Sequence, residues 1–446
     1  MMDETRTAAA PKRLTFHEAM GVAQQCHRDG LFDQAESVYR ALRKLEPGNA
    51  DAMHFFGVLR HQQGHTDEAL ALVRESIAID PAVASWHNNL GNVLLENQQL
   101  DAAAAAYTQC AELDPGNCEV LNNLGVMLAK QNRLKASEAA FREALVRNPG
   151  FADAHTNLGS LYGVKGRSDD ALHHLFEAIR LDPEDLRPRR SLGRVYLKLG
   201  DREKAAELFR DWALRDPESV EARHFLAAVT GENVPDRAPD MYVTELFDTF
   251  AASFDAKLAF LEYRAPQWVG EAAALLLGEP RRRHHILDIG CGTGLCASYL
   301  APYAKRLVGV DLSRNMLTKA EARGLYDELV RSELVAYLRA CKEPQDMIVS
   351  ADVLIYFGRL DAAFAAARQA LRAGGHLLFT VESHTDADDF KLQGSGRYSH
   401  ARAYVERELD RAGLRLCEVR EVVLRLESQV PVAGFLVTAD VIDSVT

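Results

Sequence analysis

A period of 34 residues runs through the first half of the chain and limits what that half can fold into. Prolines recur at this step, and glycines and small residues keep fixed places between them. The prolines are Pro47, Pro81, Pro115, Pro149, Pro183 and Pro217, the glycines Gly57, Gly91, Gly125, Gly159 and Gly193, and the small residues Ala35, Ala69, Ala103, Ser137, Ala171 and Ala205. Each unit is expected to be two antiparallel helices that cross at the small residues and end at the proline.

This pattern resembles the tetratricopeptide repeat, and the match covers six units over about residues 16–219. Residues 221–231 are expected to form a further helix that covers the last repeat. We expect a disordered start at residues 1–15, the repeats with their covering helix at 16–231, a linker at 232–242 and a second domain at 243–446.

Asparagine recurs at one position of three consecutive repeats, as Asn89, Asn123 and Asn157. Proteins with tetratricopeptide repeats hold partners, usually extended peptides, on the inner face of the array. A carboxamide offers donors and an acceptor, so a ladder of amides would suit a peptide backbone. The alternative is that each asparagine bonds a neighbouring repeat, and the sequence leaves both interpretations open.

The second half reads as a different fold. From residue 286 onward, short apolar runs alternate with helical stretches, which predicts a doubly wound, Rossmann-like parallel α/β sheet. Two runs near the end, LRLCEVREVVLRLE and PVAGFLVTADVI, predict an antiparallel hairpin at the edge of this sheet. Ahead of the sheet, Phe247, Phe250, Phe254, Leu258 and Leu261 recur at helical spacing, which predicts a lid helix with an aromatic stripe.

The first strand of this sheet runs into three alternate glycines, Gly290, Gly292 and Gly294, in the stretch ILDIGCGTG. Ligands of doubly wound sheets bind beyond the carboxyl ends of the strands, and glycines there let a ligand lie against bare main chain. In another register, Gly292, Gly294 and Ala297 also satisfy a loose dinucleotide fingerprint, which on its own is a weak signal.

Asp288 ahead of the glycines and Asp311 at the end of RLVGVD resemble the motifs of class I S-adenosylmethionine-dependent methyltransferases, as does the terminal hairpin. Together with FDTFAASFDAKLAFLEYRAP, LVGVDLSRNMLTKA and ADVLIYFGRL, they are similar to a bacterial group of predicted methyltransferases that carry tetratricopeptide repeats. The resemblance implies S-adenosylmethionine as cofactor, with Asp311 on its ribose hydroxyls.

The same resemblance implies a set of further cofactor residues. Glu333 stands where related sequences place an aspartate near the adenine, and Arg264 either pairs with the cofactor's carboxylate or lies on the surface. The full implied set is Tyr263, Arg264, Asp288, Gly290, Cys291, Gly292, Gly294, Asp311, Leu312, Glu333, Leu334, Ala351 and Asp352.

The region after the fifth strand is expected to overhang the transferred methyl group. His384 and His400 are candidate bases for a protonated acceptor, and Arg397 with Tyr398 would complete an acceptor site. The fourth strand ends in SADVLIYF rather than in [DN]PP[YF], so it lacks the signature of enzymes that methylate planar amino or amide nitrogens. A base is needed only when the acceptor arrives protonated.

Bulk properties exclude several other classes. A net charge of −12 disfavours nucleic acid, and the longest apolar runs are too short to span a bilayer. The seven cysteines show no CxxC pair or zinc-ligand spacing, so neither disulfide staples nor a metal site is expected. The first residues lack the apolar core of a secretory signal, which makes the cytoplasm the expected compartment.

Three functions remain open at this point. The first is methyl transfer from S-adenosylmethionine to an oxygen or nitrogen of a peptide or protein that the repeats recruit. The second is methylation of a small metabolite, with the repeats docking a partner or a second copy of the chain as a homodimer. The third is an inactive scaffold, which the intact Asp288, Asp311 and glycine set disfavours. Deletion of the residues up to Gly231 is expected to separate the first two.

Overall fold

A computed structural model describes residues 14–97, 99–251, 254–427 and 430–441, without the side chains of residues 256 and 260. Most of the expected disordered start, residues 1–13, lies outside the described residues. The chain divides into two compact units, Met1–Leu161 and Tyr162–Thr446. The division falls inside helix α9, and the domain boundaries expected near residues 231 and 243 stay a prediction.

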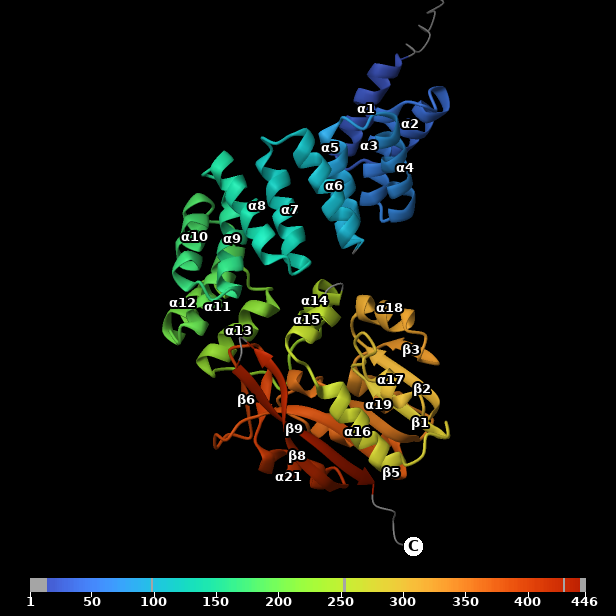
Figure 1. The fold of residues 1–446 in the computed structure, drawn as a ribbon, viewed down its shortest axis with the longest axis vertical. Coiled ribbons are helices and arrows are strands. Elements are labelled where there is room, and N and C mark those ends of the chain that lie inside the picture. Colours follow the sequence, from blue (N-terminus) through green and yellow to red (C-terminus); the bar gives the residue numbers. More distant parts are fainter. Residues whose placement is uncertain (1–13, 98, 252–253, 428–429, 442–446) are drawn as a thin grey trace, which may run out of the picture. The chain divides into compact units, whose positions relative to one another are not determined.

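The first unit consists of helices that pack in antiparallel pairs, which confirms the helical hairpins predicted from the repeat (Figure 1). Its helices are α1 (Phe16–Arg28), α2 (Phe32–Leu45), α3 (Ala50–Gln62), α4 (Thr66–Ile79), α5 (Ala84–Glu96), α6 (Leu100–Leu113), α7 (Cys118–Lys130), α8 (Leu134–Arg147) and most of α9 (Ala152–Val164). The small residues of the period are fully buried where each pair crosses, as at Ala35, Ala69 and Ala103.

Glycines of the period admit a large side chain from the partner helix. A Cβ atom on Gly91 would lie 2.6 Å from the ring of Tyr107, and one on Gly125 would lie 2.5 Å from the ring of Phe141. These distances are far below van der Waals contact, so the aromatic ring occupies the volume that any larger residue would need.

Gly125→Ala is expected to destabilise the first unit, because overpacking costs about 1–3 kcal/mol and the gain in helix propensity is only about 1 kcal/mol. Gly21 in α1 is a matched control, since a Cβ there would have nothing within 4 Å. Gly21→Ala is therefore expected to raise the unfolding temperature and Gly125→Ala to lower it, with Phe141→Leu rescuing the latter in part. Thermal unfolding that moves in the same direction for both single variants would contradict this packing.

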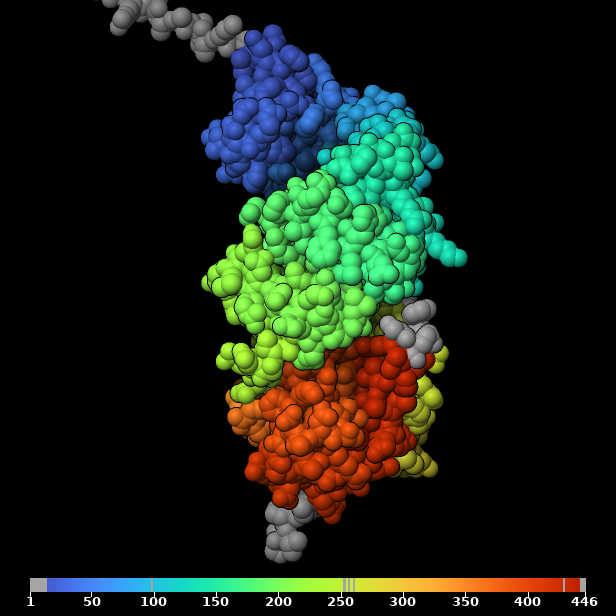
Figure 2. Space-filling model, turned by 90° about the vertical axis from the view of Figure 1, so that its left-hand side faces the viewer, coloured from blue at the N-terminus to red at the C-terminus, as the bar shows by residue number. Residues whose placement is uncertain are grey.

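The second unit begins with four more repeat-type helices after the end of α9: α10 (Ser168–Leu181), α11 (Arg187–Lys198), α12 (Arg202–Arg215) and α13 (Val220–Thr230). Helix α13 covers α12, with the rings of Phe209 and Phe225 stacked at 5.5 Å. It also contacts the carboxyl-terminal part of the unit, because His224 Nε2 lies 2.8 Å from the carbonyl oxygen of Gly396. Figure 2 shows the green surface of these helices adjoining the orange and red surface of the carboxyl-terminal part.

The segment between α13 and α14 is tied to the loop after the fourth strand. The amide of Ala238 donates to Tyr356 O at 2.7 Å, and Asp236 O accepts from the amides of Gly358 and Arg359 at 2.8 and 2.9 Å. The lid follows as α14 (Asp240–Phe250), α15 (Phe254–Phe260) and α16 (Ala265–Leu277). The aromatic stripe expected on one helix therefore lies on two, α14 and α15, with Leu261 just beyond the second.

One mixed sheet forms the rest of the unit, in the order β3-β2-β1-β4-β5-β7-β6, with β9 antiparallel to β5 and β8 paired to β9. Its strands are β1 (His284–Ile289), β2 (Ala304–Asp311), β3 (Glu328–Arg331), β4 (Gln345–Ser350), β5 (Leu371–Ser383), β6 (Phe390–Leu392), β7 (Tyr398–His400), β8 (Leu414–Glu427) and β9 (Val430–Val441). The connecting helices are α17 (Ala297–Leu300), α18 (Arg314–Ala322), α19 (Leu334–Ala340), the short 3-10 helix Leu354–Tyr356, α20 (Asp361–Ala370) and α21 (Arg402–Arg411).

This topology confirms the predicted doubly wound parallel sheet with a terminal antiparallel hairpin, β8–β9. The strand order reverses between β1 and β4, so the crevice for a ligand lies at the carboxyl end of β1. The β6–β7 hairpin was not predicted, since both strands have only three residues and a glycine-rich turn interrupts their pattern. Among the described residues, no helix combines the length and apolar character that crossing a bilayer requires.

Candidate active site

The glycine loop leaves β1 at the point where the strand order reverses. Gly290 and Gly292 have φ angles of +70° and +54°, a backbone conformation that residues other than glycine rarely adopt. A Cβ on Gly290 would lie 2.0 Å from Cγ2 of Val353, in the loop after β4. The loop therefore packs directly against the neighbouring strand's loop, and only main chain is left at this edge of the crevice.

Asp311, the last residue of β2, holds the glycine loop in place. Its Oδ2 accepts from the amide of Gly292 at 2.9 Å, and its Oδ1 accepts from the amide of Ser313 at 2.8 Å. Burial raises the pKa of this carboxyl above its usual value, against the lowering effect of the backbone amides of Ser313, Gly292 and Leu312. Each oxygen has a second lone pair, so the carboxylate can accept two more hydrogen bonds.

Asp288, in β1, lies behind the loop rather than in the crevice. It is 1% exposed, and its Oδ2 accepts from the hydroxyl of Tyr326 at 2.6 Å. Burial raises the pKa of Asp288 to about 7, although the Tyr326 hydrogen bond acts to lower it. Its observed contact is with the protein's own tyrosine, not with the cavity.

Asp288→Asn is expected to change how stability depends on pH. The ordinary pKa of the carboxyl is 3.8 and its folded value is about 7, so the native state holds a proton that the unfolded chain releases. Wild-type stability should therefore fall as pH rises from about 4 to about 7, while asparagine, which accepts from Tyr326 without a charge, removes this loss. Urea unfolding across this range should show that the free energy of unfolding of the variant rises relative to that of the wild type as the pH increases. Parallel pH profiles of the two proteins would contradict the prediction.

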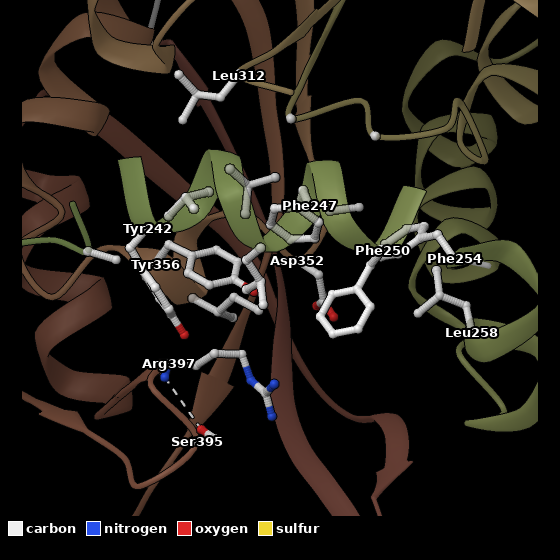
Figure 3. A pocket seen from close by; sticks show the side chains of 18 of the residues that line it. Tyr242, Phe247, Phe250, Phe254, Leu258, Leu312, Asp352, Tyr356, Ser395 and Arg397 are labelled. Atoms are coloured by element: carbon white, nitrogen blue, oxygen red, sulfur yellow. Dashed lines mark hydrogen bonds between the residues drawn. The ribbon is translucent and has the colours of Figure 1, made fainter. Parts of the chain in front are cut away.

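A cavity of about 930 Å³ opens beside the glycine loop. Ten of the residues implied by the resemblance line it: Tyr263, Gly290, Cys291, Gly292, Asp311, Leu312, Glu333, Leu334, Ala351 and Asp352. Aromatic residues of α14 and α15 form another wall, and Figure 3 shows Phe247, Phe250 and Phe254 among the side chains that line the cavity. The structure thus gathers most of the expected cofactor residues around a single space.

Three implied cofactor residues lie elsewhere. Asp288 and Gly294 do not line the cavity, and Arg264 is exposed, with its guanidinium 4.3 Å from the ring centroid of Trp268. The surface alternative therefore describes Arg264, and the prediction that it pairs with a cofactor carboxylate does not fit. Glu333 does line the cavity, but it caps α19 through the amide of Ala336 and also pairs with Arg237 at 2.9 Å.

The candidate base His400 was expected to overhang the methyl group, and its position rules this out. Its side chain is fully buried, does not line the cavity, and its Nε2 lies 2.8 Å from Phe357 O. Burial lowers its pKa to about 4, and its ring stacks on Tyr404. Strand β7 pairs with the end of β5, which turns His400 into the core.

Tyr398 and His384 also lie outside the cavity. Tyr398 is fully buried and donates its hydroxyl to Pro235 O at 2.7 Å, so it fastens the segment before α14. Neither buried ring nitrogen of His384 has a hydrogen-bond partner among the residues that the structure describes, and His384 does not line the cavity. Arg397 alone of the four predicted acceptor residues faces this space, as Figure 3 shows.

Arg397 belongs to an ion cluster that was missed at the sequence level. It donates to Glu382 at 2.7 Å and pairs with Glu427, while Arg425 donates to Asp352 at 2.8 Å and to Glu427 at 2.7 Å. Burial acts to lower the pKa of Arg425, but the three carboxylates raise it above its usual value. A signal was present, since Arg425 and Glu427 alternate with leucines at the end of β8.

The three asparagines predicted to form a ladder make hydrogen bonds between neighbouring repeats. Each side-chain amide bonds to a residue of the preceding repeat: Asn89 Nδ2 to His54 Nε2 at 3.0 Å, Asn123 Nδ2 to Asn88 Oδ1 at 3.5 Å, and Asn157 Nδ2 to Asn122 Oδ1 at 2.9 Å. The donor nitrogen of each amide therefore bonds a neighbouring repeat, as in the second of the two interpretations. The sequence alone could not choose, because both uses need the same residue at the same position.

Family comparisons identify both parts of the chain. A family model described as a methyltransferase domain matches residues 287–379, and tetratricopeptide-repeat models match residues 27–91, 88–152 and 165–229. The chain therefore carries tetratricopeptide repeats followed by a methyltransferase domain, as the sequence resemblance predicted.

Relatives with descriptive names match the methyltransferase part. Methyltransferase-like protein 27 of Homo sapiens is 40% identical over 97 residues, which is 22% of this chain and 38% of that protein. A probable S-adenosylmethionine-dependent methyltransferase of Saccharomyces cerevisiae is 31% identical over 116 residues, 24% of this chain and 39% of that protein. The chain thus spans less than half the length of these relatives. A solved Pseudomonas aeruginosa pilF structure has 20% identity and a TM-score of 0.43, covering 48% of this chain and 96% of that one.

Proposed function

We propose that this chain, which carries a methyltransferase domain behind tetratricopeptide repeats, transfers a methyl group from S-adenosylmethionine to a small acceptor held in the same cavity. The observation that carries the proposal is that Asp311 and the glycine loop border one cavity with the lid aromatics. This arrangement lies at the reversal of strand order, where ligands of such sheets bind.

The residues present fit S-adenosylmethionine. Asp311 keeps one lone pair on each oxygen, which matches a pair of ribose hydroxyls. A Cβ on Gly292 would meet only Phe254, at 4.0 Å, so the absence of a side chain there leaves room on the cavity side. Burial raises the pKa of both Asp311 and Asp352, which means that a ligand of net positive charge would favour their ionised forms.

When bound, S-adenosylmethionine would supply an activated methyl carbon, to which the acceptor's lone pair would bond in line as the carbon–sulfur bond breaks and the neutral thioether leaves. The chain's own residues position the acceptor and exclude water. Phe247, Phe250 and Tyr356 give this part of the cavity an apolar wall, and Arg397 and Arg425 are held by ion pairs beside it. The described lining residues include no histidine. An acceptor with a lone pair available at neutral pH would not need a base, and it therefore suits a lining without histidine.

Two observations favour a small acceptor over a peptide held by the repeats. The amide nitrogens expected to hold a peptide backbone already bond neighbouring repeats. The cavity is near the upper end of the range of about 300–1,000 Å³ that is common for small-molecule sites, so it has room for a second compound beside the cofactor. The repeats would then dock a protein partner or a second copy of the chain.

Tritiated methyl transfer into a cell extract tests this function. The purified full chain is incubated with labelled S-adenosylmethionine and extract, and the products are separated by size. We expect label in the small-molecule fraction, and the same reaction with Asp311→Ala serves as the background. Label confined to protein would overturn the small acceptor, and no label above background would overturn the transfer reaction.

The cavity also changes how the repeats should be tested. Removal of residues up to Gly231, the cut suggested by the sequence, would take away Arg194, Lys198 and Phe225, which line the cavity. Loss of activity in such a truncation would not separate recruitment from a damaged site. Substitutions in the full chain are therefore the sharper test.

A further inference from the structure

Residues of the last repeat and of the helix that covers it form one wall of the cavity. Helix α11 contributes Arg194, Leu197 and Lys198, and α13 contributes Phe225. This wall also packs on the catalytic part, because a Cβ on Gly394, in the β6–β7 turn, would lie 3.4 Å from Leu197. The sixth repeat is therefore part of the space that the methyltransferase domain opens onto.

The charges on this wall are of one sign. Among the described residues, the repeat helices supply Arg194, Lys198 and Arg202 to the cavity and no acidic side chain. The acidic lining residues come instead from α14 and from the strand ends: Asp240, Asp311, Glu333, Asp352 and Glu427. A basic wall in a chain of net charge −12 is a local departure from the overall balance.

Most other cavity cations already have strong partners, but two on this wall do not. Arg397 and Arg425 belong to the ion cluster, and Arg202 donates to the last carbonyls of α13. By contrast, Lys198 Nζ donates to the carbonyl of Gly163 at 2.8 Å and has no acidic partner within ion-pair distance among the described residues. The other cation, Arg194, lies 3.7 Å from Glu221 and keeps 43% of its side chain accessible.

The two cations stand next to each other and to apolar surface. Arg194 and Lys198 are four residues apart on α11, so they share one face of the helix. The guanidinium of Arg194 lies over the ring of Phe225, 4.8 Å from its centroid. Burial, and then Arg194, lowers the pKa of Lys198, and the acidic residue near the pair, Glu221, lies 3.7 Å from Arg194.

From this wall we infer that the methyl acceptor is a small molecule with an apolar body and an anionic group, and that Arg194 and Lys198 of the last repeat bind this anionic group. That the bound molecule accepts a methyl group rests on the proposed function, whereas the binding of an anion by these two residues does not. Arg194 can offer two parallel donors to a carboxylate, and Lys198 adds a point charge. The apolar body would lie along Phe225, Leu197 and the lid aromatics.

A matched set of probes tests the inference on the full chain. Phenylbutyrate, phenylbutanol and phenylbutylamine share one carbon skeleton and differ only in the charge of the end group. Calorimetric titration at neutral pH is expected to show phenylbutyrate binding at least about tenfold more tightly than the other two. Equal affinities for the acid and the amine, or no binding of any of the three, would overturn the inference.

Variants place the effect on the two residues. The double variant Arg194→Gln with Lys198→Gln should bind phenylbutyrate at least about tenfold more weakly than the wild type, with an unchanged affinity for phenylbutanol. The control is Lys204→Gln on α12, outside the cavity and paired with Asp201 at 2.8 Å, which should bind like the wild type. Charge reversal, Arg194→Glu with Lys198→Glu, should make the amine the preferred probe, a gain that a misfolded protein cannot produce. Unchanged preferences in both double variants would overturn the assignment.

Titration with S-adenosylmethionine keeps this result separate from the proposed function. Both double variants should bind S-adenosylmethionine as the wild type does, because among the described residues no hydrogen bond or ion pair joins Arg194 or Lys198 to the glycine loop or to Asp311. If the wild type fails to bind S-adenosylmethionine but prefers phenylbutyrate, the proposed function fails and the anion site stands. If S-adenosylmethionine binds and the probes show no preference for the anion, the reverse holds.

Discussion

Asp311→Ala is expected to weaken the binding of S-adenosylmethionine by at least about 100-fold. Hydrogen bonds to a charged group contribute about 1.5–3 kcal/mol each, and this carboxylate has two lone pairs free for the ribose hydroxyls. The substitution also removes the acceptor that fixes the amide of Gly292. Calorimetric titration with S-adenosylmethionine, without any acceptor, measures the effect directly.

A matched control separates ribose binding from general damage to the site. Asp248 accepts hydrogen bonds from the hydroxyl of Ser313 and from the amide of Asn315, near the start of α18. It does not line the cavity. Asp248→Asn keeps an acceptor there and is expected to bind S-adenosylmethionine within a few-fold of the wild type. Full affinity in Asp311→Ala would remove the basis for placing the nucleoside at this strand end.

Gly290→Ala is expected to cost about 2–5 kcal/mol of stability in the second unit and to abolish binding of S-adenosylmethionine. About 1–2 kcal/mol comes from forcing alanine into a left-handed conformation, and about 1–3 kcal/mol from overpacking against Val353. The φ angle here is +70°, and the new Cβ would lie 2.0 Å from a methyl group of Val353. Either the β4 loop or the glycine loop must move, and both border the cavity.

Gly324→Ala isolates the backbone part of this cost. Gly324 has a φ angle of +64°, but a Cβ there would have nothing within 4 Å. Its variant is expected to lose only the conformational contribution of about 1–2 kcal/mol and to keep its affinity for S-adenosylmethionine. Adding Val353→Ala to Gly290→Ala should restore part of the lost stability in calorimetric unfolding. Equal losses in the two single glycine variants would show that Val353 is not the obstacle.

The features predicted correctly from the sequence are those that repeat or follow local rules. The 34-residue period specified the helical hairpins, because glycines of the period face a large side chain of the partner helix, as Gly91, Gly125 and Gly193 do. Apolar runs between helical stretches specified the parallel strands, and the run ending in Asp311 placed that carboxylate at the crevice. In each case the physical cause lies within one repeat or one strand-turn unit.

The features that were missed depend on contacts between distant segments. His400 looked like a loop base, but its strand joins the end of β5 and buries the ring. Arg397 looked free to meet a substrate, and its carboxylate partners Glu382 and Glu427 come from two other strands. Arg194 and Lys198 occupy positions that are half-buried or exposed in the other repeats, so no local pattern marks them as cavity residues.

The wall that α11 and α13 supply to the cavity limits how a gene of this kind can evolve. Tandem arrays usually gain and lose units by duplication and deletion, since neighbouring units are interchangeable. Here the unit next to the catalytic part has a composition of its own, and its replacement by a copy of another unit would remove Arg194, which has no arginine at the equivalent position of the other units. Gain or loss of repeat units would therefore be tolerated at the amino-terminal end of the array. The sixth unit would instead be inherited together with the methyltransferase domain that it adjoins.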